Sequence, residues 1–172
     1  MKIAVLSDSH DHIPNLVRAV GHANEAGAEL LVHCGDLISP FMLPYLHRFQ
    51  GNIHLIYGNN MGDQHLISTR CGSMFNRITH HGILMELDVD GFRIGCHHYP
   101  ELARGLAASG RYDLVCCGHN HESGAEWLGN CLLLNPGDLL GKDEPPGFML
   151  LQTSDMSWER IIIGKRLVIE TI

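Results

Sequence analysis

The 172-residue sequence lacks the features that mark membrane, secreted and fibrous proteins. It has no run of about eighteen apolar residues that could cross a bilayer, and its first residues lack the basic and long apolar regions of a signal peptide. Repeats, low-complexity tracts and linkers rich in Pro or Ser are also absent. We therefore expect one globular domain over residues 1–172, located in the cytoplasm and without a membrane partner.

Positive charge is scarce. The chain has 12 Lys and Arg against 19 Asp and Glu, for a formal net charge of -7 at pH 7. Because stable binding to nucleic acid requires a surplus of Lys and Arg, we do not expect nucleic acid as a partner. A small phosphate ester remains compatible with this charge, since bound metal cations can reverse the local field.

Cys-x-x-Cys pairs are absent, which excludes the common thiolate zinc sites and the thioredoxin-like redox motif. Most cysteines stand in or beside apolar runs, and we interpret them as reduced core residues: Cys34, Cys96, Cys116, Cys117 and Cys131. Cys71 stands in a polar stretch and could be an exposed thiol.

Apolar runs alternate with helical patterns in the first third of the chain. Strands are predicted over residues 3–6, 30–33 and 53–57, and helices over about 14–26 and 41–49. Pro14 suits the first turn of a helix, and Leu16, Val20 and Ala23 recur behind it at helical spacing. This order predicts parallel strands joined by right-handed crossovers.

Beyond residue 78 the pattern changes to strand, turn, strand. Residues 83–89 and 92–96 flank Asp90-Gly91, a pair typical of a two-residue hairpin. A helix is predicted over 100–108, ending before Gly110. Short strands are then predicted over residues 114–117, 126–128, 131–134, 148–152, 161–163 and 167–169. Together these elements predict an α/β (α+β) fold of two packed sheets with helices outside.

Residues able to bind a metal or a phosphate follow nearly every strand that is predicted to be buried. They are Asp8, His10, Asp36, Asn59, His97, His98, His119 and His121. Ligands of open α/β sheets bind outside the carboxyl ends of the strands, so we expect these side chains to share one site. Carboxylate, amide and imidazole ligands suit manganese, iron or zinc better than calcium or magnesium, and their number indicates two ions.

Each motif alone has a simpler explanation. Asp8 and His10 could form a turn and a helix cap, and Gly35-Asp36 and Asn59-Asn60 are typical turn residues. Gly118-His119-Asn120-His121 is harder to explain by packing. The order of the motifs at successive strand ends favours a functional site. The other histidines are interpreted as surface or packing residues: His22, His33, His47, His54, His65, His80 and His81.

The ordered motifs resemble those of calcineurin-like metallophosphoesterases, most closely the small single-domain bacterial and archaeal phosphodiesterases. They are Asp8-x-His10, Gly35-Asp36, Gly58-Asn59, His97-His98, Gly118-His119-x-His121 and the later Asn135-Pro136-Gly137. The resemblance covers residues 1 to about 137. It implies a four-layer αββα sandwich, with two mixed sheets flanked by helices, and a metal-dependent hydrolase of phosphate esters with two ions at one edge.

The resemblance also implies a role for each motif residue. One ion would be held by Asp8, His10 and His121. The other would be held by Asn59, the hairpin histidine and His119, and Asp36 would bridge both ions. A hydroxide between the ions is the implied nucleophile, which makes Asp36, Asn59, His98 and His10 the implied catalytic residues. The ions are expected to be Mn²⁺, with Fe, Zn, Ni or Mg as alternatives. His98 is favoured over His97 because it shares strand parity with Ile94 and Cys96.

Three positions depart from the family pattern. Asn60 stands where relatives have His or Cys, and an amide cannot act as a general acid. Tyr99-Pro100 omits the second His of the hairpin motif. Asp138 stands where Ser is common and could place negative charge near the entrance. Asn60 and His12 are candidate substrate-binding residues, with a surface loop as the alternative for His12.

The alternative to a phosphodiesterase is a non-catalytic protein-docking scaffold, because the retromer scaffold subunit resembles the same fold. Retention of the full ligand set favours the enzyme. The sequence does not identify the natural substrate, and a homo-oligomer is compatible with it.

Overall fold

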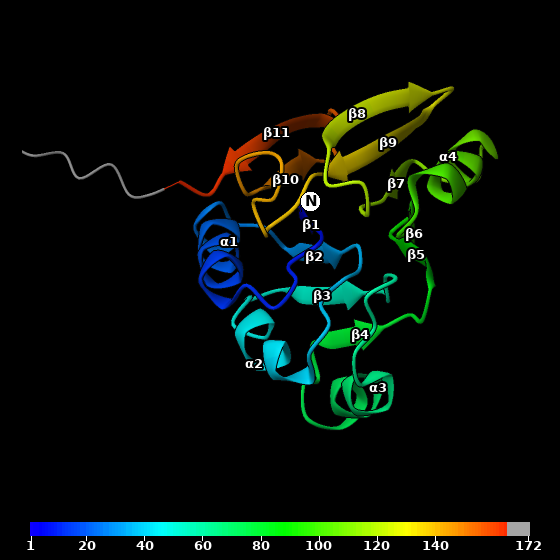
Figure 1. Cartoon of the computed structure of the whole chain (residues 1–172). Coiled ribbons are helices and arrows are strands. Elements are labelled where there is room, and N and C mark those ends of the chain that lie inside the picture. Colours follow the sequence, from blue (N-terminus) through cyan, green and yellow to red (C-terminus); the bar gives the residue numbers. More distant parts are fainter. Residues whose placement is uncertain (165–172) are drawn as a thin grey trace, which may run out of the picture.

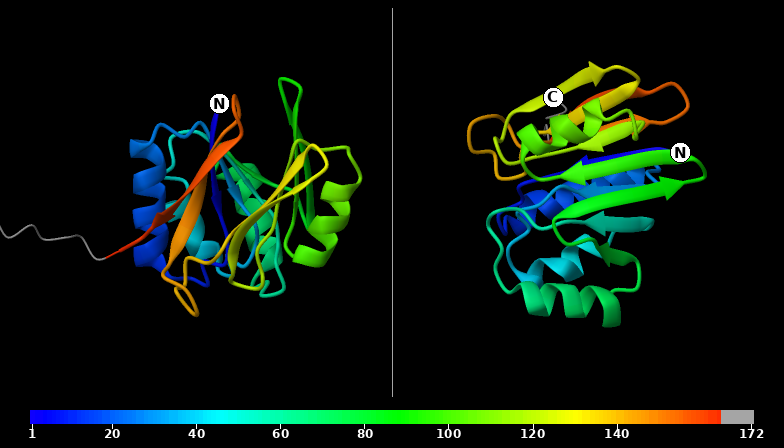
Figure 2. Two further views of the ribbon diagram at one scale, coloured as in Figure 1. Left: turned by 90° about the horizontal axis from the view of Figure 1, so that it is seen from above. Right: turned by 90° about the vertical axis from the view of Figure 1, so that its right-hand side faces the viewer.

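A computed structural model describes residues 1–164, which form two sheets packed face to face between layers of helices (Figure 1). The strand order is β11-β10-β1-β2-β3-β4 in the first sheet and β5-β6-β7-β9-β8 in the second. Seen from above, α1 covers the outer face of the first sheet and α4 the outer face of the second (Figure 2). These four layers confirm the predicted αββα sandwich. None of the helices in residues 1–164 is long and apolar enough to span a membrane.

The first sheet is parallel at its centre. β1 (Lys2–Leu6), β2 (Leu30–His33), β3 (Asn52–Leu55) and β4 (Ile78–His80) run in the same direction, and β10 (Gly147–Gln152) and β11 (Ser157–Ile162) add an antiparallel edge. The crossovers contain α1 (Ile13–Glu25), a 3-10 turn (Pro40–Met42) continued by α2 (Leu43–Leu46), and α3 (Gln64–Ser73). Parallel order sends the carboxyl ends of β1, β2 and β3 to the same edge.

The second sheet begins with the predicted hairpin of β5 (Leu84–Val89) and β6 (Phe92–His97). Asp90 and Gly91 have φ values of 52° and 87°, the left-handed conformation that a two-residue type I′ turn requires. After α4 (Pro100–Ala108), β7 (Leu114–Cys116) pairs in parallel with β6 and β9 (Cys131–Pro136), and β8 (Ser123–Leu128) closes the sheet. The carboxyl ends of β6 and β7 therefore also lie at one edge of their sheet.

The main core lies between the sheets. Ile3 and Val5 of β1 pack there with Ile94 and Leu114 of the second sheet, whereas Ala4 and Leu6 pack toward the helices. β1 is thus buried on both faces, as a central parallel strand must be. Each fully buried Ile or Leu contributes roughly 1.5–3 kcal/mol. This core fixes the position from which the loops after the strands emerge.

All six cysteines are buried and free. This confirms the prediction for most of them, but the prediction for Cys71 is wrong. Its side chain is 3% exposed, because Ile67 and Cys71 form a narrow apolar stripe on the inner side of α3. Burial raises the pKa of the Cys71 thiol to about 11.

Several boundaries differ from the predictions. The sequence did not reveal α3 or β4, and the helix predicted over 41–49 is a 3-10 turn followed by one short helical turn. The strands predicted over 126–128 and 161–163 are β8 and β11, which both start earlier. The strand predicted over 167–169 lies outside the described residues.

Candidate metal centre

The candidate ligands meet at one edge of the sandwich, beyond the carboxyl ends of β1, β2, β3, β6 and β7. Two groups of side chains offer ligand atoms that all lie within 4.8 Å of one another: Asp8 with His10 and His121, and Asp8 with Asp36 and His98. Asp8 belongs to both groups. The first sheet supplies the carboxylates and His10, and loops from the second sheet supply His98 and His121.

Asp8 is fully buried, and its two oxygens differ. Oδ2 accepts hydrogen bonds from Ser7 Oγ at 2.5 Å and from the His119 amide at 3.0 Å. Oδ1 lies 3.7 Å from His10 Nε2, 3.6 Å from His121 Nε2 and 3.9 Å from His98 Nε2. Neither Asp8 Oδ1 nor His10 Nε2 has a hydrogen-bond partner among the described residues. Buried polar atoms are rarely left without one, so this pair calls for a ligand.

Asp36 is also buried and directs one oxygen toward each half of the cluster. Its Oδ2 lies 3.6 Å from His10 Nε2, and its Oδ1 lies 3.6 Å from His98 Nε2. Asn60 holds this carboxylate with its amide N–H, 2.8 Å from Oδ1, and its side-chain Nδ2, 2.5 Å from Oδ2. The structure thus places Asn60 against Asp36, where it fixes the orientation of the carboxylate.

Asn59 connects the remaining histidines. Its Oδ1 lies 2.9 Å from His98 Nε2 and 2.8 Å from His119 Nδ1. His98 Nδ1 lies 2.8 Å from the carbonyl oxygen of Cys34, which assigns the proton to Nδ1 and leaves the Nε2 lone pair for the cluster. His97 instead accepts a hydrogen bond from the Tyr99 amide through Nδ1, at 3.2 Å. The structure therefore places His98 with the other candidate ligands.

The loops that carry the ligands have unusual backbone conformations. Asp8, His10, Asp36, His119 and His121 all have φ between 41° and 74°, which costs about 1–3 kcal/mol for each such residue. Such strain persists where contacts over-determine the loop, and here the amides of Asp8 and His10 donate to the carbonyls of Gly35 and Asp36. The strained loops thus bring the candidate ligand side chains together, whereas relaxed turns would direct them apart.

Two glycines permit this packing. A Cβ atom at Gly118 would overlap Ser7 Oγ and the Asp8 carboxylate, and one at Gly58 would overlap the Asp36 carboxylate. The acidic side chains occupy the space that any other residue at these positions would need.

Electrostatics inside the cluster favours the charged form of Asp8. Burial acts to raise the pKa of Asp8, but the interaction with His10 and the hydrogen bonds from Ser7 and the His119 amide lower it below the usual value. The pKa of His10 is raised, mainly by Asp8 and against the effect of burial. The anionic pair attracts positive charge, and a divalent cation would supply more of it than a protonated imidazole.

The donor set fits divalent metal ions. It combines two buried carboxylates, an amide oxygen and several imidazoles, and two of its atoms have no hydrogen-bond partner in the part of the chain that the structure describes. Mixed oxygen and nitrogen donors of this kind suit manganese, iron or zinc. The candidate ligands predicted from sequence are thus together, whereas His12 caps α1 by accepting the Asn15 amide at 3.2 Å.

Sequence reasoning missed the residues behind the ligands. Asp138 was expected near the entrance, but it is fully buried behind His121, with Oδ2 2.5 Å from His121 Nδ1. That prediction is wrong because the chain turns inward after Gly137, and Asp138 then accepts the amides of Gly141 and Lys142. An acid directly after a strand-end Asn-Pro-Gly was the available signal. His33, at 0% exposure, is a further packing residue, and burial lowers its pKa to about 4.

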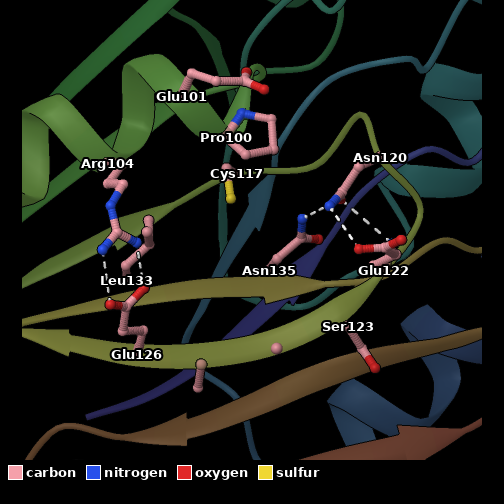
Figure 3. Close-up of a pocket in the computed structure, with 12 residues that line it drawn as sticks. Pro100, Glu101, Arg104, Cys117, Asn120, Glu122, Ser123, Glu126, Leu133 and Asn135 are labelled. Carbon is pink, nitrogen blue, oxygen red and sulfur yellow. Dashed lines mark hydrogen bonds and ion pairs between the residues drawn. The ribbon is translucent and has the colours of Figure 1, made fainter.

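Asn135 supports the loop of His119 and His121 from behind. Its Nδ2 donates to the Gly118 carbonyl at 3.2 Å and to Asn120 Oδ1 at 2.7 Å. Figure 3 shows Asn120 and Asn135 beside a pocket of about 410 Å³ that lies between α4 and the β8–β9 ribbon. The Arg104–Glu126 ion pair borders this pocket. The amide network thus links β9 to the candidate metal ligands.

The chain is similar to proteins of known family. Residues 1–156 match the model of the calcineurin-like phosphoesterase superfamily domain. The chain is 32% identical over 165 residues to Phosphodiesterase MJ0936 of Methanocaldococcus jannaschii, covering 95% of this chain and 99% of that protein.

Two solved structures show the same fold. A novel archaeal phosphodiesterase superposes with a TM-score of 0.87 at 28% identity, over 95% of this chain and 100% of the other. Vps29 of Entamoeba histolytica in complex with Zn²⁺ superposes with a TM-score of 0.65 at 18% identity, over the same shares, and at that identity it shows the fold alone.

Proposed function

Because the chain belongs to the calcineurin-like phosphoesterase superfamily and is a hydrolase of phosphoric esters, we propose that it cleaves small phosphodiesters at a site for two divalent ions. The observation that carries this proposal is the pair of overlapping ligand groups. They share the buried Asp8, whose Oδ1 has no hydrogen-bond partner within residues 1–164, and Asp36 directs one oxygen to each side.

We assign the residues to two ions, and their contacts support this assignment. Asp8, His10 and His121 would hold one ion, Asn59, His98 and His119 the other, and Asp36 would contact both. Bound there, the ions would supply Lewis acidity, which activates water near neutral pH and offsets negative charge on phosphoryl oxygens. Mn²⁺ is the ion that we propose for this mixed donor set.

The chain's own residues orient these groups. Asn60 keeps Asp36 from rotating, the Cys34 carbonyl fixes the tautomer of His98, and Asp138 fixes that of His121. Asn60 cannot protonate a leaving group, so substrates whose leaving groups are stable anions are favoured. The choice of a diester over a monoester is supported by the relative of 32% identity, which is a phosphodiesterase.

The test is hydrolysis of bis(4-nitrophenyl) phosphate and of 4-nitrophenyl phosphate by metal-stripped protein, with and without added Mn²⁺. We expect Mn²⁺-dependent cleavage, faster for the diester, that is lost in His119→Ala. His22→Ala is the matched control, since it removes an exposed imidazole on α1. Absence of cleavage with any divalent ion, in protein that binds the ion, would contradict the proposal.

A docking scaffold is the second candidate function, because Vps29 has the same fold. The Asp36→Asn variant distinguishes the two candidate functions. An enzyme should lose hydrolysis in this variant. A scaffold should keep its cellular function, and a pull-down with the variant should recover a stable partner.

A further inference from the structure

A second pocket, of about 370 Å³, adjoins the candidate metal centre and is mostly apolar. Asn59 and His98 line it together with Met61, Ile83 and Leu102. The last three come from the loop after β3, the residue before β5 and the first turn of α4. The pocket and the metal centre therefore share a boundary made of candidate ligands.

Large apolar side chains are exposed around this pocket. Ile83 is 63% exposed, Leu102 56%, Met61 39% and Tyr99 37%. Among the residues that line it within the described chain, none is Lys, Arg, Asp or Glu. A second phosphate would find no cation there, so the walls suit an uncharged apolar group.

Tyr99 connects the pocket to the metal centre. Its ring lies edge-on to His119, with 4.5 Å between ring centroids and an interplanar angle of 62°, and 5.6 Å from the ring of His98. Tyr99 thus lies beside two candidate ligands and also lines the pocket. Aromatic groups pack well on such a surface, in offset or edge-to-face contact.

We propose that this pocket binds an apolar, preferably aromatic, ester group of the substrate, which makes phosphodiesters with such a group the substrate class. The inference rests on the proposed function, because it assumes phosphate at the metal centre. The volume is sufficient, since an apolar cavity of about 150 Å³ already accommodates benzene. A single- or double-ring group therefore fits.

The experiment compares phenylphosphonate with methylphosphonate by calorimetric titration of the Mn²⁺-loaded protein. We expect wild type to bind the phenyl compound about tenfold or more tightly, because a pocket discriminates by roughly that factor for even one methylene. Ile83→Ser with Leu102→Ala should remove most of this preference. Ile162→Ser, an equivalent change at a residue of β11 that is 46% exposed, should leave it unchanged.

A parallel assay of Mn²⁺-dependent hydrolysis of 4-nitrophenyl methyl phosphate by wild type separates the two proposals. Hydrolysis with equal affinity for both phosphonates would overturn the pocket assignment and leave the proposed function in place. A phenyl preference that the double variant removes, without hydrolysis of any diester, would support the pocket and contradict the proposed function. Loss of the preference in Ile162→Ser as well would also overturn the assignment.

Discussion

Replacing Asp138 with Asn should weaken metal binding without unfolding the protein. Asp138 accepts three donors with its two oxygens: His121 Nδ1 at 2.5 Å, the Gly141 amide at 2.7 Å and the Lys142 amide at 3.2 Å. Asn offers one oxygen and adds two N–H donors, so at least one buried donor would face another donor.

An unsatisfied buried donor costs about 1–3 kcal/mol, which should lower the free energy of unfolding of the variant. Loss of an acceptor behind a metal-binding histidine typically costs about 10- to 100-fold in affinity, or about 1.4–2.7 kcal/mol. Because Asp138 is fully buried, solvent cannot replace the lost acceptor. We therefore expect Mn²⁺ affinity to fall by one to two orders of magnitude.

The assay is a titration with Mn²⁺ against a competing chelator, with thermal unfolding of the metal-free proteins to verify folding. Asp113→Asn is the matched control, because Asp113 pairs with Arg93 at 3.4 Å on the surface and should not affect the metal. Unchanged Mn²⁺ affinity in a folded Asp138→Asn protein would refute the assignment of Asp138 as the residue that positions His121.

Three further predictions concern the surroundings of the site. Gly118→Ala should reduce Mn²⁺ affinity more than tenfold and lower the free energy of unfolding by about 1–3 kcal/mol, because the added Cβ would overlap Ser7 and Asp8. Gly105→Ala is the control, because a Cβ at that position would meet open space, and it should lower neither quantity. Equal denaturation curves and affinities for the two variants would contradict this prediction. Asn135→Ala should accelerate amide hydrogen exchange in the loop of residues 118–121, and unchanged exchange would show that the loop is held otherwise. Burial lowers the pKa of His54 and His80 to about 4 each. Well above pH 6.5 both histidines are neutral in the folded and the unfolded chain, so they do not affect the free energy of unfolding. As the pH falls toward 4, the unfolded chain binds protons that the folded chain does not, and the folded protein loses stability. Between pH 7 and 5 the free energy of unfolding of the metal-free wild type, measured in urea, should therefore fall by up to about 2 kcal/mol per histidine more than that of a variant with both His54→Gln and His80→Gln. Parallel plots of unfolding free energy against pH for the two proteins would refute this prediction.

The candidate ligands were predictable because their signal is local. A short polar motif directly after an apolar strand, as at Asp8 or Asp36, is visible in the sequence, and parallel strand order determines which ends meet. Asp90-Gly91 was equally informative, since a two-residue turn depends on the conformations of those residues alone.

α3 and β4 were not predictable from hydrophobic pattern. α3 buries only Ile67 and Cys71, and its start depends on Asp63, whose side chain accepts the Leu66 amide at 2.9 Å. β4 is three residues long. Tertiary packing of a narrow stripe stabilises this helix, and a pattern average does not detect such a stripe.

The supporting residues were not predictable for a different reason. The contact of Asp138 with His121 spans 17 positions, and that of Asn60 with Asp36 spans 24. Such contacts depend on where two loops finally meet, so the sequence identified Asp138 as unusual without indicating the direction of its side chain.

The division of the candidate ligands between the two sheets has a consequence for oxidation. An ion held by Asp8 and His121 would cross-link the layers at one end, much as a disulfide links two segments. Cys34, directly after β2, lies between the layers with Cys96 and Cys116 of the second sheet, all at 0% exposure. Chelation would remove the cross-link, and a faster reaction of these thiols with a thiol reagent in the metal-free protein would show that the bound ion limits access to the core between the sheets.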